Sequence, residues 1–126
     1  MNTIYETIVT KIGAKAQDFY SEKIVILFGD NVPDELIEYC VLHNNNIDKA
    51  HIDYKNIEVG DILKINEEKF KITAVGELVN INLKNLGHIT IKFDGSTIAE
   101  LPGTLHVENK NIPIINVGDA IVIVRE

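Results

Sequence analysis

The sequence has no tryptophan, and among its 126 residues there are only 1 cysteine, 3 prolines and 8 glycines. The lone cysteine, Cys40, cannot form a disulfide within the chain. So little glycine and proline argues against a collagenous or low-complexity chain, and a hydrophobic fraction of 45% is too high for a disordered one. The length matches one ordinary domain, so we expect a single globular domain over residues 1–126.

Long apolar runs are also missing. No stretch approaches the roughly 20 apolar residues that a membrane-spanning helix needs. The opening segment, MNTIYETIVT, has no basic patch, no long apolar core and no small-residue cleavage site, so it does not resemble a secretory signal. We therefore expect a cytoplasmic protein that meets a membrane only through a partner.

Basic residues are scarce. The chain has 12 Lys and Arg against 19 Asp and Glu, a formal charge of −7 at pH 7. Because cationic side chains supply most of the affinity for a phosphate backbone, nucleic acid is not the expected ligand. The acidic residues are scattered along the chain, which favours a solvated surface over the alternative of an acidic rim that steers a basic protein partner.

Short runs of β-branched and aromatic residues, separated by Gly, Asn, Asp and Pro, predict an all-β, or mainly β, fold. We expect eight strands, which cover residues 3–12, 23–28, 39–42, 62–65, 69–75, 88–93, 105–107 and 120–124. So many short strands in one domain suggest a barrel or a sandwich.

Two short helical turns are expected between these strands. Pro33 suits the first position of one of them, with acidic residues directly after it. In the other, Val79, Leu83 and Leu86 follow a helical spacing that ends at Gly87, a typical C-terminal cap.

The tripeptide Val-Gly-Asp occurs twice, each time before an apolar strand. Gly60 and Gly118 are expected to adopt a positive φ, and the side chains of Asp61 and Asp119 to cap the two turns. We interpret the repetition as turn chemistry used twice and not as a functional repeat.

The usual catalytic signatures are absent, since there is no GxGxxG, GxxxxGK[ST], GxSxG, HExxH or CxxC motif. Four histidines remain: His43, His51, His88 and His106. Their separations of 8, 37 and 18 residues match no metal-ligand spacing. We predict no metal site and no cofactor, and keep a metal-dependent isomerase or cupin-like barrel as a weaker alternative.

His43 stands out because it ends the apolar run EYCVLH and precedes Asn44, Asn45 and Asn46. Neutral imidazole has a lone pair near pH 7 and can form a covalent intermediate, so the position suits a nucleophile beside amide donors. The alternative is a strand-end histidine that caps a turn. Cys40 precedes His43 by three residues and should point to the opposite strand face, as a small buried hydrophobe and not a dyad partner.

Five segments together resemble one protein family. They are IYETIVTKIGAKA, PDELIEYCVLH, FKITAVGE, NLGHITIKFDG and LPGTLHVE, the last followed by a Val-Gly-Asp turn. In this order the chain resembles the glucitol/sorbitol-specific IIA component of the bacterial phosphoenolpyruvate-dependent sugar phosphotransferase system (PTS). The resemblance implies a small, partly open β-barrel with one or two short helical turns.

The resemblance also implies a function. His43 is then the phosphorylated histidine, which accepts a phosphoryl group from the phosphocarrier protein HPr and passes it to the IIB component of the glucitol/sorbitol permease during sugar uptake. The protein is expected to be a phosphotransferase component without a metal or cofactor. Because two partners must reach the ring, His43 is expected in a shallow exposed depression with an apolar rim, for which Val41, Leu42 and Ile47 are candidates.

Partners of the ring or of the phosphoryl group are harder to assign. The candidates are Asn44, Asn45, His88, Thr104 and His106, of which Thr104 belongs to a Pro-Gly-Thr turn that offers backbone N–H groups. The function of a different class that we consider is a non-catalytic β-barrel module that binds a protein or a small sugar.

Overall fold

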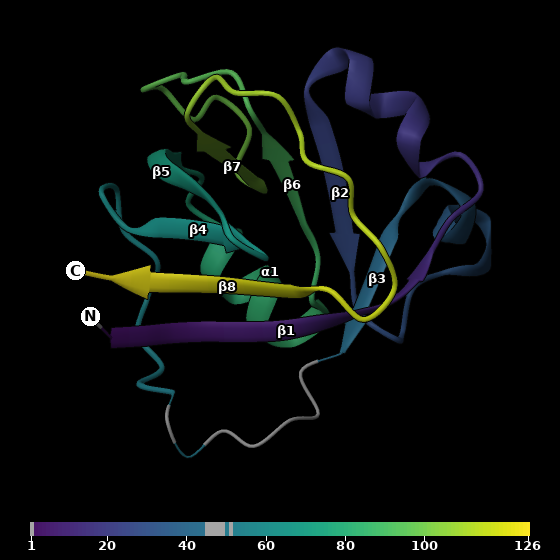
Figure 1. Ribbon diagram of the computed structural model, residues 1–126, viewed down its shortest axis with the longest axis horizontal. Coiled ribbons are helices and arrows are strands. Elements are labelled where there is room, and N and C mark those ends of the chain that lie inside the picture. The colour runs from purple at the N-terminus through teal and green to yellow at the C-terminus, as the bar shows by residue number, and fades with distance from the viewer. Residues whose placement is uncertain (1, 45–49, 51) are drawn as a thin grey trace.

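Residues 2–44, 50 and 52–126 are described in the computed structural model, and their strands close into one barrel (Figure 1). The strands are β1 (Asn2–Ile12), β2 (Ile24–Phe28), β3 (Val41–Asn44), β4 (Ile62–Ile65), β5 (Glu68–Val75), β6 (Ile89–Lys92), β7 (Thr104–Val107) and β8 (Ala120–Arg125). Around the barrel they follow the order β1-β3-β2-β6-β7-β5-β4-β8. The predicted mainly β barrel is confirmed, and its ladder closes fully where the resemblance implied a partly open one.

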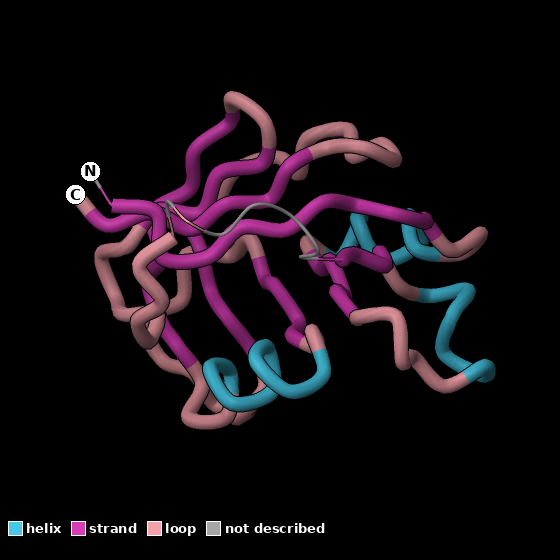
Figure 2. Tube along the Cα trace, turned by 90° about the horizontal axis from the view of Figure 1, so that it is seen from below, coloured by secondary structure: helices cyan, strands magenta, loops and turns pink. Residues whose placement is uncertain are grey.

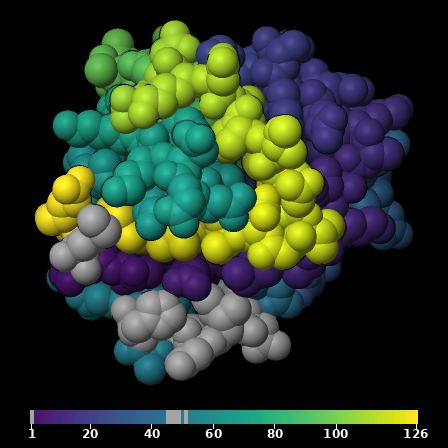
Figure 3. Space-filling model, in the orientation of Figure 1, coloured from purple at the N-terminus to yellow at the C-terminus, as the bar shows by residue number. Residues whose placement is uncertain are grey.

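The first and last strands complete the closure. β1 pairs with β8 in antiparallel fashion from Asn2, opposite Arg125, to Ile8, opposite Ala120. Figure 3 shows these two segments side by side across one face of the molecule.

Two of the pairings are parallel, β2 with β3 and β6 with β7. Parallel neighbours need a crossover connection because the chain has to return to the same end of the sheet. Residues 29–40 make that return between β2 and β3, and they place β3 between β2 and β1. The histidine-bearing strand is thereby set inside the sheet, next to the N-terminal strand.

The third strand lies further along the chain than expected. The predicted strand ended at Leu42, whereas β3 runs through His43 to Asn44. Val41, Leu42 and His43 are all buried, with exposed fractions of 0%, 8% and 3%. A strand that is covered on both faces has no alternation of apolar and polar residues, and its end is therefore poorly marked in the sequence.

In the described part of the chain three short helices accompany the strands: η1 (Ala16–Glu22), η2 (Asp34–Tyr39) and α1 (Val79–Leu86). Both predicted helical turns are confirmed. Pro33, expected at the first helical position, is the N-cap of η2, and Gly87 is the C-cap of α1 with φ of 66°. The 3₁₀ helix η1 was not expected. It lies with η2 at one side of the molecule, away from α1 (Figure 2).

No helix in the described part of the chain is long and apolar enough to cross a membrane.

The barrel interior is filled by side chains of all eight strands and by Val79 and Leu83 of α1. A smaller cluster of Phe28, Cys40 and Leu42 lies outside it. Cys40 is 2% exposed, and burial raises the pKa of its thiol. The prediction that Cys40 is a small buried hydrophobe is therefore confirmed, although Cys40 lies at the C-cap of η2 and not within β3.

Both Val-Gly-Asp turns form as predicted. Gly60 and Gly118 have φ of 96° and 93°. The side chain of Asp61 accepts a hydrogen bond from the Glu58 N–H at 2.8 Å, and that of Asp119 accepts one from the Asn116 N–H at 2.7 Å. The two turns differ in their surroundings, because only the first lies beside Arg125.

Candidate functional site

Three elements meet at the His43 imidazole. β3 carries the ring, and Val9 of β1 lies opposite His43 in the ladder. The ring Nδ1 lies 2.6 Å from the Thr7 Oγ1 of β1, and Nε2 lies 2.7 Å from the carbonyl oxygen of Gly87, the cap of α1. Both ring nitrogens therefore have a partner.

The two contacts decide where the hydrogen of the neutral ring lies. A carbonyl oxygen can only accept a hydrogen bond, so Nε2 carries the hydrogen and donates it to Gly87. Nδ1 then holds the lone pair, and the Thr7 hydroxyl donates to it. Neutral His43 is therefore the Nε2–H tautomer.

The surroundings of His43 also keep its charge low. Burial lowers the pKa of His43 below the usual 6.5, while the Gly87 carbonyl and the charge of Asp30 act in the opposite direction. The net effect is a lowered pKa, so the ring is neutral and keeps one lone pair near pH 7.

A hollow of about 250 Å³ opens beside the ring. It is lined by Tyr5, Gly29, Asp30, Asn31, His43, Asn44, Leu83, Lys84, Asn85, Leu86 and Gly87. The volume is several times the share of about 30 Å³ that one water molecule takes up. The hollow therefore has room for a group of several atoms beside the imidazole.

The expectation of an exposed ring in a shallow depression is wrong, because His43 is only 3% exposed. β3 holds it inside the sheet and the end of α1 covers it. Val41 and Leu42 are buried in the protein, and apolar wall residues come from α1 as Leu83 and Leu86. Ile47, the third expected rim residue, lies outside the described residues.

The polar lining of the hollow combines one carboxylate, one amine and several amides. Asn44, a predicted partner, donates from Nδ2 to the Asp30 carboxylate at 2.6 Å. Lys84 on α1 supplies the cation, and Asn31 and Asn85 supply further amides. The predicted neighbour Asn45 lies outside the described residues, as does His51.

Three other predicted residues do not line the hollow. His88 donates from Nδ1 to the Leu27 carbonyl at 3.1 Å and stacks on Phe28 at 4.3 Å between ring centroids. His106 contacts the Asp94 carboxylate at 2.8 Å. Thr104 and His106 belong to β7, which is separated from β3 by β2 and β6.

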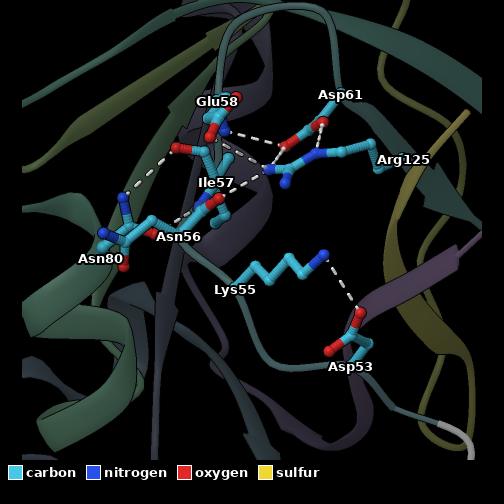
Figure 4. A network of polar contacts seen from close by, with 8 residues as sticks. All are labelled: Asp53, Lys55, Asn56, Ile57, Glu58, Asp61, Asn80 and Arg125. Carbon is cyan, nitrogen blue, oxygen red and sulfur yellow. Dashed lines mark hydrogen bonds and ion pairs between the residues drawn. The ribbon is translucent and has the colours of Figure 1, made fainter.

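A larger hollow of about 750 Å³ lies next to the first, and Tyr5, Leu83 and Lys84 line both. Its wall contains the polar network of Figure 4, in which the Arg125 guanidinium donates to both Asp61 oxygens at 2.8 and 2.9 Å and to the Asn56 carbonyl. Burial would raise the pKa of Asp61, but hydrogen bonds from Arg125 and the Glu58 N–H lower it. This network ties the C-terminal strand to the segment before β4.

Sequence reasoning missed Thr7 and Lys84, and it assigned Gly87 only a capping role. Thr7 sits in an ordinary strand pattern, where threonine is common for its β-branched shape. Lys84 had no cationic neighbours in the sequence to indicate an anion site. Only the fold brings these residues to the histidine.

Among the described residues, no group of three or more His, Cys, Asp and Glu side chains is arranged to hold a metal ion. The chemistry available in the hollow is that of a neutral imidazole with amide and amine donors around it.

Known proteins resemble the chain over most of its length. The family profile for the PTS system glucitol/sorbitol-specific IIA component matches residues 4–122. The glucitol/sorbitol-specific EIIA components of Shigella flexneri and of Escherichia coli (strain K12) are each 39% identical to it over 108 residues, which is 85% of this chain and 83% of theirs.

A solved structure agrees with these matches. The crystal structure of a PTS system IIA component from Enterococcus faecalis V583 is similar with a TM-score of 0.80 and 30% identity, over 93% of this chain and 97% of that one. The chain therefore belongs to the family of glucitol/sorbitol-specific IIA components of the sugar phosphotransferase system, and it is a phosphotransferase component that works through a phosphohistidine.

Proposed function

We propose that His43 carries the phosphoryl group, which it receives from phosphorylated HPr and passes to the IIB component of a glucitol/sorbitol permease. The observation that carries this proposal is the neutral His43 imidazole in the wall of a hollow. The same wall contains the Lys84 amine and several side-chain amides. We further propose that residues 1–126 act as one domain and that the exchange takes place in the cytoplasm.

The transfer balances without a cofactor. A lone pair on a ring nitrogen of His43 forms a bond to phosphorus, the phosphorus–nitrogen bond of the HPr phosphohistidine breaks, and its electron pair returns to the HPr imidazole. In the second transfer His43 is the leaving group. The protein assists this transfer mainly by placing hydrogen-bond donors and positive charge beside the phosphoryl oxygens, and only to a small extent by covalent chemistry.

The lining of the hollow supports the proposal electrostatically. The Lys84 amine and the amides of Asn31, Asn44 and Asn85 are suited to phosphoryl oxygens. Asp30 repels a phosphoryl group, which favours its onward transfer. The proposal gives no part to His88, Thr104 and His106, whose stabilising role stays a prediction from the sequence.

Labelling tests the assignment. The protein is incubated with radioactive phosphoenolpyruvate, the general PTS phosphotransferase enzyme I and HPr, and the labelled peptide is mapped. We expect acid-labile, base-stable label on the peptide that contains His43, and its complete loss in His43→Gln. His51→Gln is the matched control and should keep the label.

Label that persists in folded His43→Gln would refute the assignment. A second measurement follows transfer from the labelled protein to the IIB component, and label that cannot be passed on would refute the proposed role as an intermediate carrier. The alternative of a non-catalytic binding module predicts no covalent phosphate at all, and family membership gives it no support.

A further inference from the structure

The Thr7 side chain is completely buried, with an exposed fraction of 0%, although it carries a hydroxyl. Its buried neighbours along β1 are Ile4 and Val9, and a valine of the same shape could fill its place. Burying a hydroxyl is unfavourable unless it forms a hydrogen bond. The reason for a threonine here therefore lies in the hydroxyl's partner, which is the Nδ1 of His43 at 2.6 Å.

The hydrogen bonds of this group run in one direction. Thr7 has one hydroxyl hydrogen, and it goes to the Nδ1 of His43. The hydrogen on Nε2 of His43 goes to the Gly87 carbonyl. The donors therefore run from Thr7 through His43 to the Gly87 carbonyl.

The ring is thus held at opposite ends by two different elements. The Gly87 carbonyl is fixed because Gly87 caps α1, where its N–H bonds to Leu83. The Thr7 hydroxyl is fixed because β1 is paired on both sides, with β3 and β8. With both contacts present, the plane of the imidazole and its tautomer are set before any partner arrives.

We propose that Thr7 is a positioning residue for His43: its hydroxyl, together with the Gly87 carbonyl, fixes the orientation of the ring and the Nε2–H tautomer from which phosphoryl transfer begins. The inference rests on the proposed function of His43. In this tautomer the lone pair is on Nδ1, so the hydrogen bond from Thr7 opens when Nδ1 bonds phosphorus, while Nε2 keeps its hydrogen and its bond to the Gly87 carbonyl holds the ring in place. Without the hydroxyl, Gly87 alone holds the ring.

The first test uses the native protein labelled with ¹⁵N at histidine. The ¹⁵N chemical shifts of His43 should show a hydrogen on Nε2 and a hydrogen-bonded lone pair on Nδ1. A spectrum with the hydrogen on Nδ1 in the neutral ring overturns the proposal. This measurement needs no variant and does not depend on whether His43 becomes phosphorylated.

The second test compares Thr7→Val, which removes only the hydroxyl, with Thr7→Ser, which keeps it. We expect Thr7→Val to lower the maximal rate of phosphoryl uptake from HPr about tenfold, with an unchanged KM for HPr, because the loss of one hydrogen bond leaves the ring less well oriented. Its Nδ1 signal should move toward that of a free lone pair. Thr7→Ser should restore both the rate and the signal.

Thr10→Val, an exposed threonine on the same strand, is the matched control and should leave the rate unchanged. An unchanged or faster rate in folded Thr7→Val overturns the positioning role, and so does failure of Thr7→Ser to restore the rate. If Thr7→Val does not fold, the rate of Thr7→Ser and the ¹⁵N spectrum of the native protein still test the proposal. These outcomes can be told apart from failure of the proposed function, because in that case the native protein itself would show no phosphorylation of His43.

Discussion

At the scale of single residues, the central feature is the His43 imidazole, which is almost inaccessible to solvent and is uncharged for that reason. Such a ring resists protonation, because the positive charge would lose water without gaining a close carboxylate. Asp30 faces the same hollow and limits the effect, but the pKa of His43 remains lowered. This has a consequence for stability that can be measured.

We expect the free energy of unfolding to fall as the pH drops below about 6.5, in part because of His43. The folded pKa of His43 is lowered from 6.5, so the unfolded chain takes up the proton more readily and acid favours unfolding. This stability is complete above pH 6.5 and is lost as the pH falls through the folded pKa. Urea unfolding at several pH values checks it.

The matched variant in this series is His43→Gln, which cannot titrate. The native protein should lose more stability between pH 7 and pH 5 than this variant does. Parallel pH profiles for the two proteins would contradict the lowered pKa of His43.

Gly87 is the second residue with a specific role. Its φ is 66°, and an added Cβ would lie 2.9 Å from the Gly29 nitrogen and 3.0 Å from the His43 Nε2. We expect Gly87→Ala to lower the free energy of unfolding by about 2 kcal/mol, since strain in the left-handed conformation adds to these clashes. It should also slow phosphoryl uptake, because the ring has to shift.

The control for this prediction is Gly118→Ala. Gly118 has φ of 93°, but nothing lies within 4 Å of an added Cβ. Thermal and urea unfolding should show a smaller loss of stability than for Gly87→Ala, and uptake should be unchanged. Equal effects on uptake would show that contact with His43 does not matter.

At the scale of elements, the two Val-Gly-Asp turns form a natural comparison. Asp61 is 3% exposed and receives hydrogen bonds from Glu58 and from Arg125, whereas Asp119 is half-buried and caps only its own turn. Asp61→Ala should lower the free energy of unfolding by about 2–3 kcal/mol, and Asp119→Ala by about 1 kcal/mol. Urea unfolding of the two variants checks the difference.

The pH dependence of these variants separates them further. Hydrogen bonds from Arg125 and Glu58 lower the pKa of Asp61 below 3.8 despite its burial, so its contribution is present above pH 3.8 and is lost only as acid protonates it. The difference between native protein and Asp61→Ala should therefore shrink at low pH. A difference that does not change with pH would contradict this account.

The elements also show what the sequence could predict. The strand β4 and the helix α1 followed from local patterns, because apolar alternation, a helical spacing and Gly87 as a cap are each encoded within a few residues. The extent of β3 was not predictable, since burial on both faces removes the alternation. The contact of Thr7 with His43 joins residues 36 positions apart, and no local signal records it.

His43 is proposed from the sequence because it ends an apolar run before three asparagines and because its segment resembles a known family. Its burial could not be predicted, since it depends on the placement of β3 between β2 and β1 and on the end of α1. Residues around it, such as Lys84, become neighbours only in the closed barrel.

At the scale of the whole molecule, the ends of the chain close the barrel. Asn2 lies opposite Arg125 in the β1–β8 pair, and Figure 1 places the two termini beside each other. We expect a circular permutant that joins the old ends with a short Gly/Ser linker, and opens the exposed turn between Asn66 and Glu67, to fold with one cooperative transition. Circular dichroism and calorimetry check this.

A second permutant, opened within β1 between Thr7 and Ile8, is the control. It divides the strand that pairs with both β3 and β8 and should not form the barrel. A cooperative transition in this control would show that closure through β1 is not needed for folding.

Closure also bears on how the protein behaves at high concentration. Each described strand is hydrogen-bonded to a neighbour on both sides over at least part of its length, so the described residues leave only short stretches of strand edge that could recruit a strand from another molecule. Free edges are where amyloid-like aggregation commonly starts. A closed barrel of this kind therefore offers few places at which its sheet could become a template for self-association.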